Sequence, residues 1–320
     1  MRYVIIGAGA VGGVIGGLLA RAGRDVVLVA RGPHLAALQE DGLQLRTPGE
    51  TRQLPVPAVA SVAEIGWREG DVAVLTVKGQ DTEGVLTALD AVAPAGLAVI
   101  CAQNGVANER RALRRFAQVH GMCVMLPAAH LEPGVVVGFG EPVAGILDVG
   151  RYPSGTDAVD EAIATDLRVA GFAAEPHPAV MRAKHRKLLM NLVNAAVALA
   201  GPDADTSEVV GAAVAEGEAV LAAGGIDVAT AEEDRARRAD GFRIGTVEGV
   251  PRGGGSTWQS LARGTGAVEA DTLNGEIVLL GRLHGVPTPV NEHLRRLVHQ
   301  AARDGRPPGS TAVEALLPPT

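Results

Sequence analysis

The chain has 320 residues, of which 47% are hydrophobic and 2% aromatic, and a formal net charge of −7. This length is enough for two domains with separate cores, and those cores must consist mainly of Ala, Val and Leu. The acidic balance excludes the basic surface that nucleic acids require, and the sequence has no apolar run of membrane-spanning length. Two cysteines do not make a disulfide scaffold, so we expect a cytoplasmic protein that binds neither nucleic acid nor membrane. The first predicted strand begins at Arg2, so no targeting segment is expected.

Residues 1–31 predict a strand, a glycine-rich turn, a helix and a second strand. The turn has the spacing G-x-G-x-x-G, and its residues are Gly7, Ala8, Gly9, Ala10, Val11 and Gly12. In a dinucleotide site the first glycine allows the tight turn, the second lets the backbone approach the pyrophosphate, and the third lets the helix pack on the strand. The helix N-terminus then offers N–H groups to phosphate. Glycines that serve packing alone are the alternative, but the position between an apolar strand and a helix favours dinucleotide binding.

The end of the second strand indicates which dinucleotide is bound. NAD sites place Asp or Glu there to accept from the ribose hydroxyl, whereas NADP sites accommodate the 2′-phosphate with Arg. This chain has Ala30 and then Arg31 at that point. An exposed arginine with no such role is the alternative, and the motif context favours NADP.

The rest of the first half continues the alternation of strands and helices. Two segments, 43–47 and 51–57, are expected to form a small excursion outside the parallel sheet. Lys78 and Asn104 follow apolar strands, at the edge of the sheet where ligands bind in open α/β folds. The other predicted strands are 71–77, 97–101, 119–126, 134–138, 142–147 and 172–175, with helices at 33–40 and 155–170.

After Pro178 the periodicity becomes helical, and no strand is predicted. Helices are expected at 179–200, 206–224, 229–245, 267–284 and 289–303, with a glycine-rich loop at 251–255. The sequence therefore predicts an α/β protein with a Rossmann-like dinucleotide-binding domain at 1–178 and an all-helical domain at 179–303. The proline-rich segment 304–320 is expected to be a flexible tail.

The helix at 179–200 carries polar residues among apolar ones. Lys187, Asn191 and Asn194 are spaced four and three apart and share a helix face. Buried amides and an ammonium need partners, which a ligand or a structural network between helices could equally supply. A second polar cluster contains Ser256, Thr257 and Glu269; an acid near a helix start is also stabilised by the helix dipole alone.

Together these motifs resemble the 2-dehydropantoate 2-reductase (ketopantoate reductase) family over residues 1–303. The resemblance is carried by the glycine turn, Arg31, Thr76-Val77-Lys78, Gln103-Asn104-Gly105, Arg186-Lys187-Leu188 with Asn191, Ser256-Thr257 before Glu269, and Asn274-Gly275 leading to His284-Gly285-Val286-Pro287. It implies an NADPH-dependent oxidoreductase in which Lys187 is the general acid and Glu269 supports it.

By the same resemblance, substrate is held by Asn104, Asn191 and the Ser256 and Thr257 hydroxyls, and Asn194 is a further candidate substrate ligand. The cofactor is held by the glycine turn, Arg31, Lys78 and Asn104, and no metal is required. The expected partner is a small 2-oxo acid; a homodimer is compatible with the sequence, which does not fix the oligomeric state.

The chain departs from the family pattern near the substrate. The family commonly places a second Asn eight residues after the lysine, where this chain has Ala195; Asn194 could replace it only if the helix is locally distorted. Thr257 stands where Ser is usual, and Val137 to Gly140 lacks a histidine often found there. We expect reduction of a 2-oxo acid, 2-dehydropantoate foremost. The alternatives are a relative that reduces another 2-oxo acid and a non-catalytic NADP-binding sensor.

Overall fold

The structure, a computed structural model, describes residues 1–319 except 131, 240–241, 251–253, 265 and 267. The chain divides into two units by its internal packing. The sheet unit consists of Met1–Gln103, Asn108–Ala183 and Glu232–Pro251, and the helical unit of Asn104–Ala107, Lys184–Ala231 and Arg252–Thr320. The expected boundary after residue 178 lies close to the division at Ala183. The return of 232–251 to the sheet unit was not anticipated.

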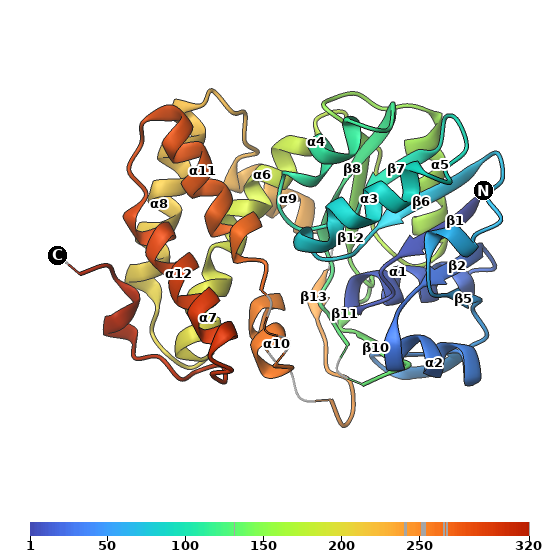
Figure 1. The fold of residues 1–320 in the computed structure, drawn as a ribbon, viewed down its shortest axis with the longest axis horizontal. Coiled ribbons are helices and arrows are strands. Elements are labelled where there is room, and N and C mark those ends of the chain that lie inside the picture. The colour runs from blue at the N-terminus through green and yellow to red at the C-terminus, as the bar shows by residue number, and fades with distance from the viewer. Residues whose placement is uncertain (131, 240–241, 251–253, 265, 267, 320) are drawn as a thin grey trace. The chain divides into compact units, whose positions relative to one another are not determined.

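A seven-stranded sheet in the order β12-β8-β7-β6-β1-β2-β5 forms the centre of the sheet unit (Figure 1). Its strands are β1 Arg2–Ile6, β2 Asp25–Val29, β5 Ala58–Val59, β6 Asp71–Leu75, β7 Ala98–Cys101, β8 Gln118–Met125 and β12 Ile146–Arg151. All neighbours are parallel except β12, which runs antiparallel to β8. This order is that of a Rossmann-like sheet, with β1 beside both β2 and β6. The predicted α/β fold class is confirmed.

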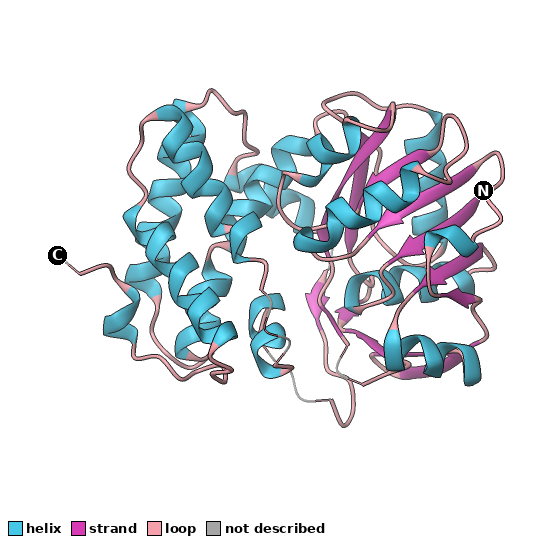
Figure 2. Ribbon diagram, in the orientation of Figure 1, coloured by secondary structure: helices cyan, strands magenta, loops and turns pink. Residues whose placement is uncertain are grey.

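Both faces of this sheet are buried, which explains why its strands are continuous apolar runs. In β1, Tyr3 and Ile5 belong to the hydrophobic core on one face, and Val4 and Ile6 to the core on the other. The helices of the unit are α1 Ala10–Arg21, α2 Gly32–Glu40, α3 Thr82–Asp90, α4 Asn108–Leu113, α5 Ala158–Val169 and α9 Ala231–Arg238, with 3₁₀ turns η1 Val62–Glu64 and η2 Gly79–Asp81. Figure 2 shows the helices in cyan and the strands in magenta.

The predicted excursion is confirmed, because it forms part of a separate four-stranded sheet. That sheet has the order β4-β3-β10-β9, with β3 Leu43–Thr47, β4 Glu50–Leu54, β9 Ala128–Ala129 and β10 Val135–Gly138. The strand predicted at 172–175 is only partly formed, since this segment meets β12 through isolated bridges at Ala173 and Pro176.

The helix predicted at 229–245 is wrong in its second half. The helix α9 ends at Arg238, and Arg243–Ile244 forms β13, which pairs antiparallel with β11, Gly140–Glu141. Val247 then packs with Phe139 in a small hydrophobic cluster. A strand this short is held by a partner distant in the sequence, which local periodicity cannot reveal. The prediction that no strand follows residue 179 is thereby corrected.

The helical unit confirms the helical character of the rest of the second half. Its elements are α6 Val180–Asn191, α7 Val193–Ala200, α8 Ser207–Ala223, α10 Ser256–Ala262, η3 Ala270–Thr272, α11 Asn274–His284, α12 Pro289–Arg303 and η4 Val313–Leu316. Of the predicted glycine-rich loop at 251–255, residues 251–253 lie outside the described residues.

The single helix predicted at 179–200 is two helices. The interruption is at Leu192, whose N–H donates to the Leu189 carbonyl at 3.3 Å, three residues back rather than four. Such a tightened turn changes the phase of the helix between Asn191 and Asn194. The local distortion on which a role for Asn194 depends is therefore present.

The segment expected to be a flexible tail makes backbone contacts with the helical unit in this structure. Backbone N–H groups of Gly309 and Thr311 donate to the carbonyls of Ala198 and Leu199, at 3.0 and 2.9 Å. Leu316 is fully buried in the helical unit. Prolines prevent a long helix here, but the segment is tied to α7. Among the described residues, no helix combines the length and apolar character needed to cross a membrane.

Candidate active site

The glycine turn after β1 has the geometry that its spacing predicts. Gly7 has φ +109°, and a Cβ there would lie 2.8 Å from the backbone N of Val77. A Cβ on Gly12 would lie 2.3 Å from the Gly7 carbonyl oxygen, so the close packing of α1 on β1 requires glycine. A Cβ on Gly9 would meet no described atom within 4 Å, so the space beside that residue is open. The second glycine thus faces the side on which a ligand can approach.

The N-terminus of α1 presents backbone donors at the same place. Gly13 donates the first hydrogen bond of the helix, to the Gly9 carbonyl at 2.7 Å. The N–H groups of Ala10, Val11 and Gly12 belong to the first turn, where helix geometry offers them no partner. Together with the open space at Gly9, these donors fit the pyrophosphate of a dinucleotide.

Arg31 lies at the N-cap of α2, directly beyond the carboxyl end of β2, and is exposed. In the described part of the chain its guanidinium makes no hydrogen bond or ion pair. β2 places no acidic residue at its end, since Val29 is followed by Ala30. Arg31 is therefore suited to a 2′-phosphate, and the end of β2 has no Asp or Glu side chain to accept from a ribose hydroxyl.

Lys78 follows β6 and is half-buried at the start of the η2 turn. The strand end that precedes it is bound to the glycine turn. Thr76 Oγ1 donates to the carbonyls of Ile6 and Gly7, at 3.1 and 2.8 Å. Gln103, at the end of β7, donates through Nε2 to the Val77 carbonyl at 2.7 Å. These contacts fix the strand ends that surround the predicted cofactor site.

In the helical unit, two predicted substrate ligands are in direct contact. Asn191 Nδ2 donates to Asn104 Oδ1 at 3.2 Å, although the residues are 87 positions apart. Asn191 is 6% exposed and lies one turn after Lys187 on α6. Gly105 fixes the Asn104 loop, because at φ +81° a Cβ there would lie 2.8 Å from the Thr272 carbonyl oxygen. Asn104 is thus held between α6 and the turn that follows Glu269.

Asn194 and Ser256 form a second part of the candidate substrate site. Asn194, on α7, has its Oδ1 2.8 Å from the point where a Cβ on Gly255 would lie, so the amide sits against the start of α10. The Ser256 hydroxyl is enclosed and has no hydrogen-bond partner among the described residues. Such an unsatisfied buried hydroxyl is expected where a ligand will bind. Ala195, by contrast, is 2% exposed and packed inside, while Thr257 is 3% exposed.

Glu269 lies at the N-cap of the η3 turn and is half-buried. Its carbonyl accepts from the Thr272 backbone at 3.0 Å and from Thr272 Oγ1 at 3.1 Å. The neighbouring Asp271 is bound to α12, with Arg295 Nη1 at 2.7 Å and His299 Nε2 at 2.9 Å. Burial raises the pKa of Asp271, but the Arg295 hydrogen bond and the nearby His299 outweigh it and hold that pKa below its ordinary value. A hollow of about 410 Å³ lies beside these groups.

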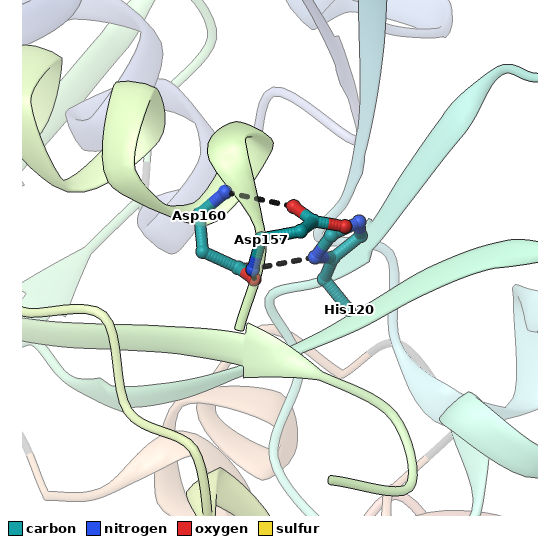
Figure 3. A group of neighbouring side chains, drawn as sticks. All are labelled: His120, Asp157 and Asp160. Atoms are coloured by element: carbon teal, nitrogen blue, oxygen red, sulfur yellow. Dashed lines mark hydrogen bonds and ion pairs between the residues drawn. The ribbon is translucent and has the colours of Figure 1, made fainter. Parts of the chain in front are cut away.

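One cluster elsewhere has the composition of a metal site. His120, Asp157 and Asp160 place ligand atoms within 4.8 Å of one another (Figure 3). Each carboxylate is already in use: Asp160 accepts from His120 Nδ1 at 2.6 Å and from the Asp157 backbone at 2.9 Å. Asp157 accepts from the backbone of Val159 and Asp160 and from Arg151. These bonds form a capping box at the start of α5, so the cluster is read as structural.

Three residues to which the sequence assigned no role hold the glycine turn and the strand ends beside it, namely His34, Thr76 and Gln103. His34 Nε2 lies 2.7 Å from the Ala8 carbonyl oxygen, inside the glycine turn. Their contacts could not be predicted from local sequence, because each residue bonds a backbone carbonyl of a segment distant in the chain. A polar residue directly after an apolar strand was the one available signal, and it applied to Thr76 and Gln103.

Comparison with known proteins assigns most of the chain to one family. Residues 3–153 match the family model described as ketopantoate reductase PanE/ApbA, and residues 179–302 match that of its C-terminal domain. The 2-dehydropantoate 2-reductase of Halobacterium salinarum is 31% identical over 95% of this chain and 100% of that protein. The enzyme of Pyrococcus horikoshii is 30% identical over 93% of this chain and 96% of its own length.

Solved structures support the same family assignment. The PanE/ApbA family ketopantoate reductase from Ralstonia eutropha superposes with a TM-score of 0.79 at 30% identity, covering 96% of this chain and all of that one. A D-mandelate dehydrogenase in complex with NADH and anilino(oxo)acetate has a TM-score of 0.80 at 24% identity, covering 95% and 99%, and shows that the fold is shared. The chain therefore belongs to the ketopantoate reductase (PanE/ApbA) family and is an oxidoreductase.

Proposed function

We propose that this enzyme uses NADPH to reduce a 2-oxo acid to a 2-hydroxy acid, with 2-dehydropantoate as the substrate and pantoate as the product. The observation that carries this proposal is the contact between Asn104 and Asn191, at 3.2 Å, one helical turn from Lys187. It joins two expected substrate ligands from distant segments beside the expected proton donor. The near full-length likeness to enzymes named 2-dehydropantoate 2-reductase supports the choice of substrate.

For the cofactor, the glycine turn and the first N–H groups of α1 hold the pyrophosphate, and Arg31 binds the 2′-phosphate. Lys78 contributes positive charge near the same strand ends. When bound, the nicotinamide supplies the hydride for the carbonyl carbon of the substrate. No metal is needed for this chemistry.

Lys187 acts as the general acid. As the carbonyl carbon is reduced, negative charge develops on its oxygen, and an ammonium stabilises this charge and donates a proton to it. Glu269 supports Lys187 electrostatically. Asn104, Asn191, Asn194, Ser256 and Thr257 bind the carboxylate and hydroxyl groups of the substrate. The buried Ser256 hydroxyl has no hydrogen-bond partner among the described residues, which supports its place in this set.

A second candidate is a relative whose pocket accepts another 2-oxo acid. The observation that favours it is Ala195, which is packed inside at the position where the family commonly has its second Asn. The D-mandelate dehydrogenase of the same fold also shows that proteins with this architecture act on other hydroxy acids.

The test is an NADPH-oxidation screen with purified enzyme over 2-dehydropantoate, aliphatic 2-oxo acids and aromatic 2-oxo acids, repeated with NADH. We expect the highest kcat/KM for 2-dehydropantoate with NADPH. A higher value for another oxo acid would favour the second candidate. Absence of turnover with every acid, together with tight NADPH binding, would instead indicate a cofactor-binding sensor.

A further inference from the structure

His34 contacts the cofactor loop and a second sheet at the same time. It lies in the first turn of α2, three residues after Arg31. Its Nε2 is 2.7 Å from the Ala8 carbonyl oxygen, and its Nδ1 is 2.9 Å from the backbone N of Gly134, in the turn before β10. The His130 ring packs on it, with centroids 4.2 Å apart. All of these groups belong to the sheet unit, where Figure 1 labels α2 and β10.

The hydrogen bonds determine the tautomer of His34. A backbone N–H can only donate, so Nδ1 must accept from Gly134. The ring proton is then on Nε2 and is donated to the Ala8 carbonyl. The neutral ring satisfies both partners, whereas an imidazolium could not accept from Gly134. Burial lowers the pKa of His34, although the bond to Ala8 opposes this, so the neutral form is favoured.

The bond to Ala8 completes a set of contacts that fix the glycine turn. Thr76 Oγ1 donates to the carbonyls of Ile6 and Gly7, and Gly13 donates to the carbonyl of Gly9. With His34 on Ala8, every carbonyl from Ile6 to Gly9 accepts a hydrogen bond. The peptide planes of the turn are therefore fixed, and the first-turn N–H groups of α1 are directed before any ligand arrives. Preorganised donors bind an anion without the entropic cost of ordering the loop on binding.

We propose that His34 is a positioning residue for the cofactor. His34 joins the pyrophosphate-binding turn to the start of α2, which carries Arg31. The inference rests on the proposed dinucleotide site and adds to it a residue that does not touch the ligand. Because the pyrophosphate is common to NADPH and NADH, loss of His34 should weaken both, whereas loss of Arg31 should weaken NADPH alone.

Three variants separate positioning from packing. In His34→Gln the side-chain amide can reach the Ala8 carbonyl as Nε2 does. In His34→Asn the shorter amide can satisfy only Gly134, and His34→Phe keeps a ring but neither hydrogen bond. The matched control is His293→Phe, since His293 Nε2 also bonds a backbone carbonyl, that of Ala315 at 3.0 Å, but lies in the helical unit.

The measurements are the Kd of NADPH and of NADH by fluorescence titration, the KM for NADPH, kcat at saturating NADPH, and Tm. We expect Kd and KM to rise about five- to tenfold in His34→Phe and His34→Asn, from the loss of one hydrogen bond that orders the turn. His34→Gln should stay within about twofold of wild type, and kcat should change little in all three. His293→Phe should bind both cofactors normally.

Wild-type affinity in His34→Phe, or a loss shared equally by His34→Gln, would overturn the positioning role, as would a loss confined to kcat or to Tm. These outcomes are distinct from failure of the proposed function. If the wild type prefers NADH, or if it reduces no 2-oxo acid, the proposed function fails, while weaker binding of the preferred dinucleotide by His34→Phe still supports the role of His34.

Discussion

The two units carry their functional groups in different ways. In the sheet unit the predicted phosphate ligands are mainly backbone N–H groups of one continuous turn. That turn is held by side chains from neighbouring elements, such as Thr76 after β6 and His34 on α2. In the helical unit the predicted substrate ligands are side chains from separate segments, as the hydrogen bond between Asn191 and Asn104 illustrates. Because several backbone donors share the binding of phosphate, single substitutions around the glycine turn should each change cofactor affinity by a moderate amount. The polar side chains proposed to act in the helical unit, Lys187 foremost, should each lose a distinct chemical function when substituted.

The largest effect is expected for Lys187→Ala, which removes the proton donor from the helical unit. We expect kcat to fall by about 10²–10⁴-fold, the usual contribution of general acid catalysis. The Kd of NADPH, measured by fluorescence titration, should stay within about twofold, because the glycine turn, Arg31 and Lys78, which are proposed to bind the cofactor, lie in the other unit. Lys187→Arg keeps the charge but cannot release its proton, so it should also lose most of the turnover. Normal turnover in either variant would contradict the proposed role of Lys187 as the general acid.

Asp160→Ala should separate stability from function in the sheet unit. The side chains of His120 and Asp160 are fully buried, and the substitution removes both the partner of His120 and half of the capping box. We expect the unfolding free energy to fall by about 2–4 kcal/mol in urea titrations, with kcat retained below the melting range. Asp205→Ala, which removes an exposed acid bonded to the Ser207 backbone, is the control and should lower the unfolding free energy much less. Equal losses would contradict the role given to burial.

Arg31→Ala tests the proposed contact of the sheet unit with the 2′-phosphate, which depends on a side-chain charge. The Kd of NADPH should rise about 10–100-fold, because a charge-assisted bond to phosphate is lost, while the Kd of NADH should change by less than about twofold. Arg52→Ala, which removes an exposed arginine paired with Glu50, is the control and should leave both unchanged. Equal weakening of NADPH and NADH would refute the 2′-phosphate role.

Gly255→Ala probes the helical unit without removing a polar group. The added Cβ would lie 2.8 Å from Asn194 Oδ1 and should displace that amide. We expect the KM for the 2-oxo acid to rise about three- to tenfold, through one weakened hydrogen bond, with NADPH binding unchanged. Gly211→Ala in α8 is the control, since a Cβ there meets no described atom within 4 Å. An unchanged KM in Gly255→Ala would argue that Asn194 does not contact substrate.

The smallest effect is expected for Asp271→Asn, which weakens the attachment of the η3 turn to α12. The pKa of Asp271 is held below its ordinary value, so its contribution to stability is present above the unfolded pKa and is lost as pH falls through the folded pKa. Because the carboxylate is 63% exposed, the difference from wild type at neutral pH should be below about 1 kcal/mol. Urea titrations at neutral and strongly acidic pH should show this difference disappear in acid. A difference that grows in acid would contradict the assignment.

Local sequence was sufficient for most of the sheet unit. The strand around Val4 and the turn at Gly7 to Gly12 follow from apolar runs and glycine spacing, which are properties of adjacent residues. The pairing of Arg243–Ile244 with Gly140–Glu141 could not be predicted, because two residues of strand carry no periodicity and depend on a distant partner. The hydrogen bond between His34 and the Ala8 carbonyl could not be predicted either, because it also joins segments that are distant in the chain.

In the helical unit, helix existence was predictable but helix continuity was not. The apolar pattern through Leu188 and Leu199 indicated one helix, whereas the interruption at Leu192 follows from a single three-residue hydrogen bond. The polar residues were recognised from spacing and family resemblance together. The contact of Asn194 with Gly255 became visible only in three dimensions.

The return of residues 232–251 to the sheet unit has a consequence for building chimeras of this enzyme. The chain changes unit after residues 103, 107, 183, 231 and 251, so neither unit is one uninterrupted stretch of gene. A fragment ending near residue 178 would lack β13 and Val247, and would leave Phe139 and the edge of β11 without their partners. If cofactor specificity were exchanged between relatives by a single crossover near residue 178, the sheet unit of the chimera would combine strands of one relative with the 232–251 segment of the other. Such a graft must carry the 232–251 segment together with the first 183 residues.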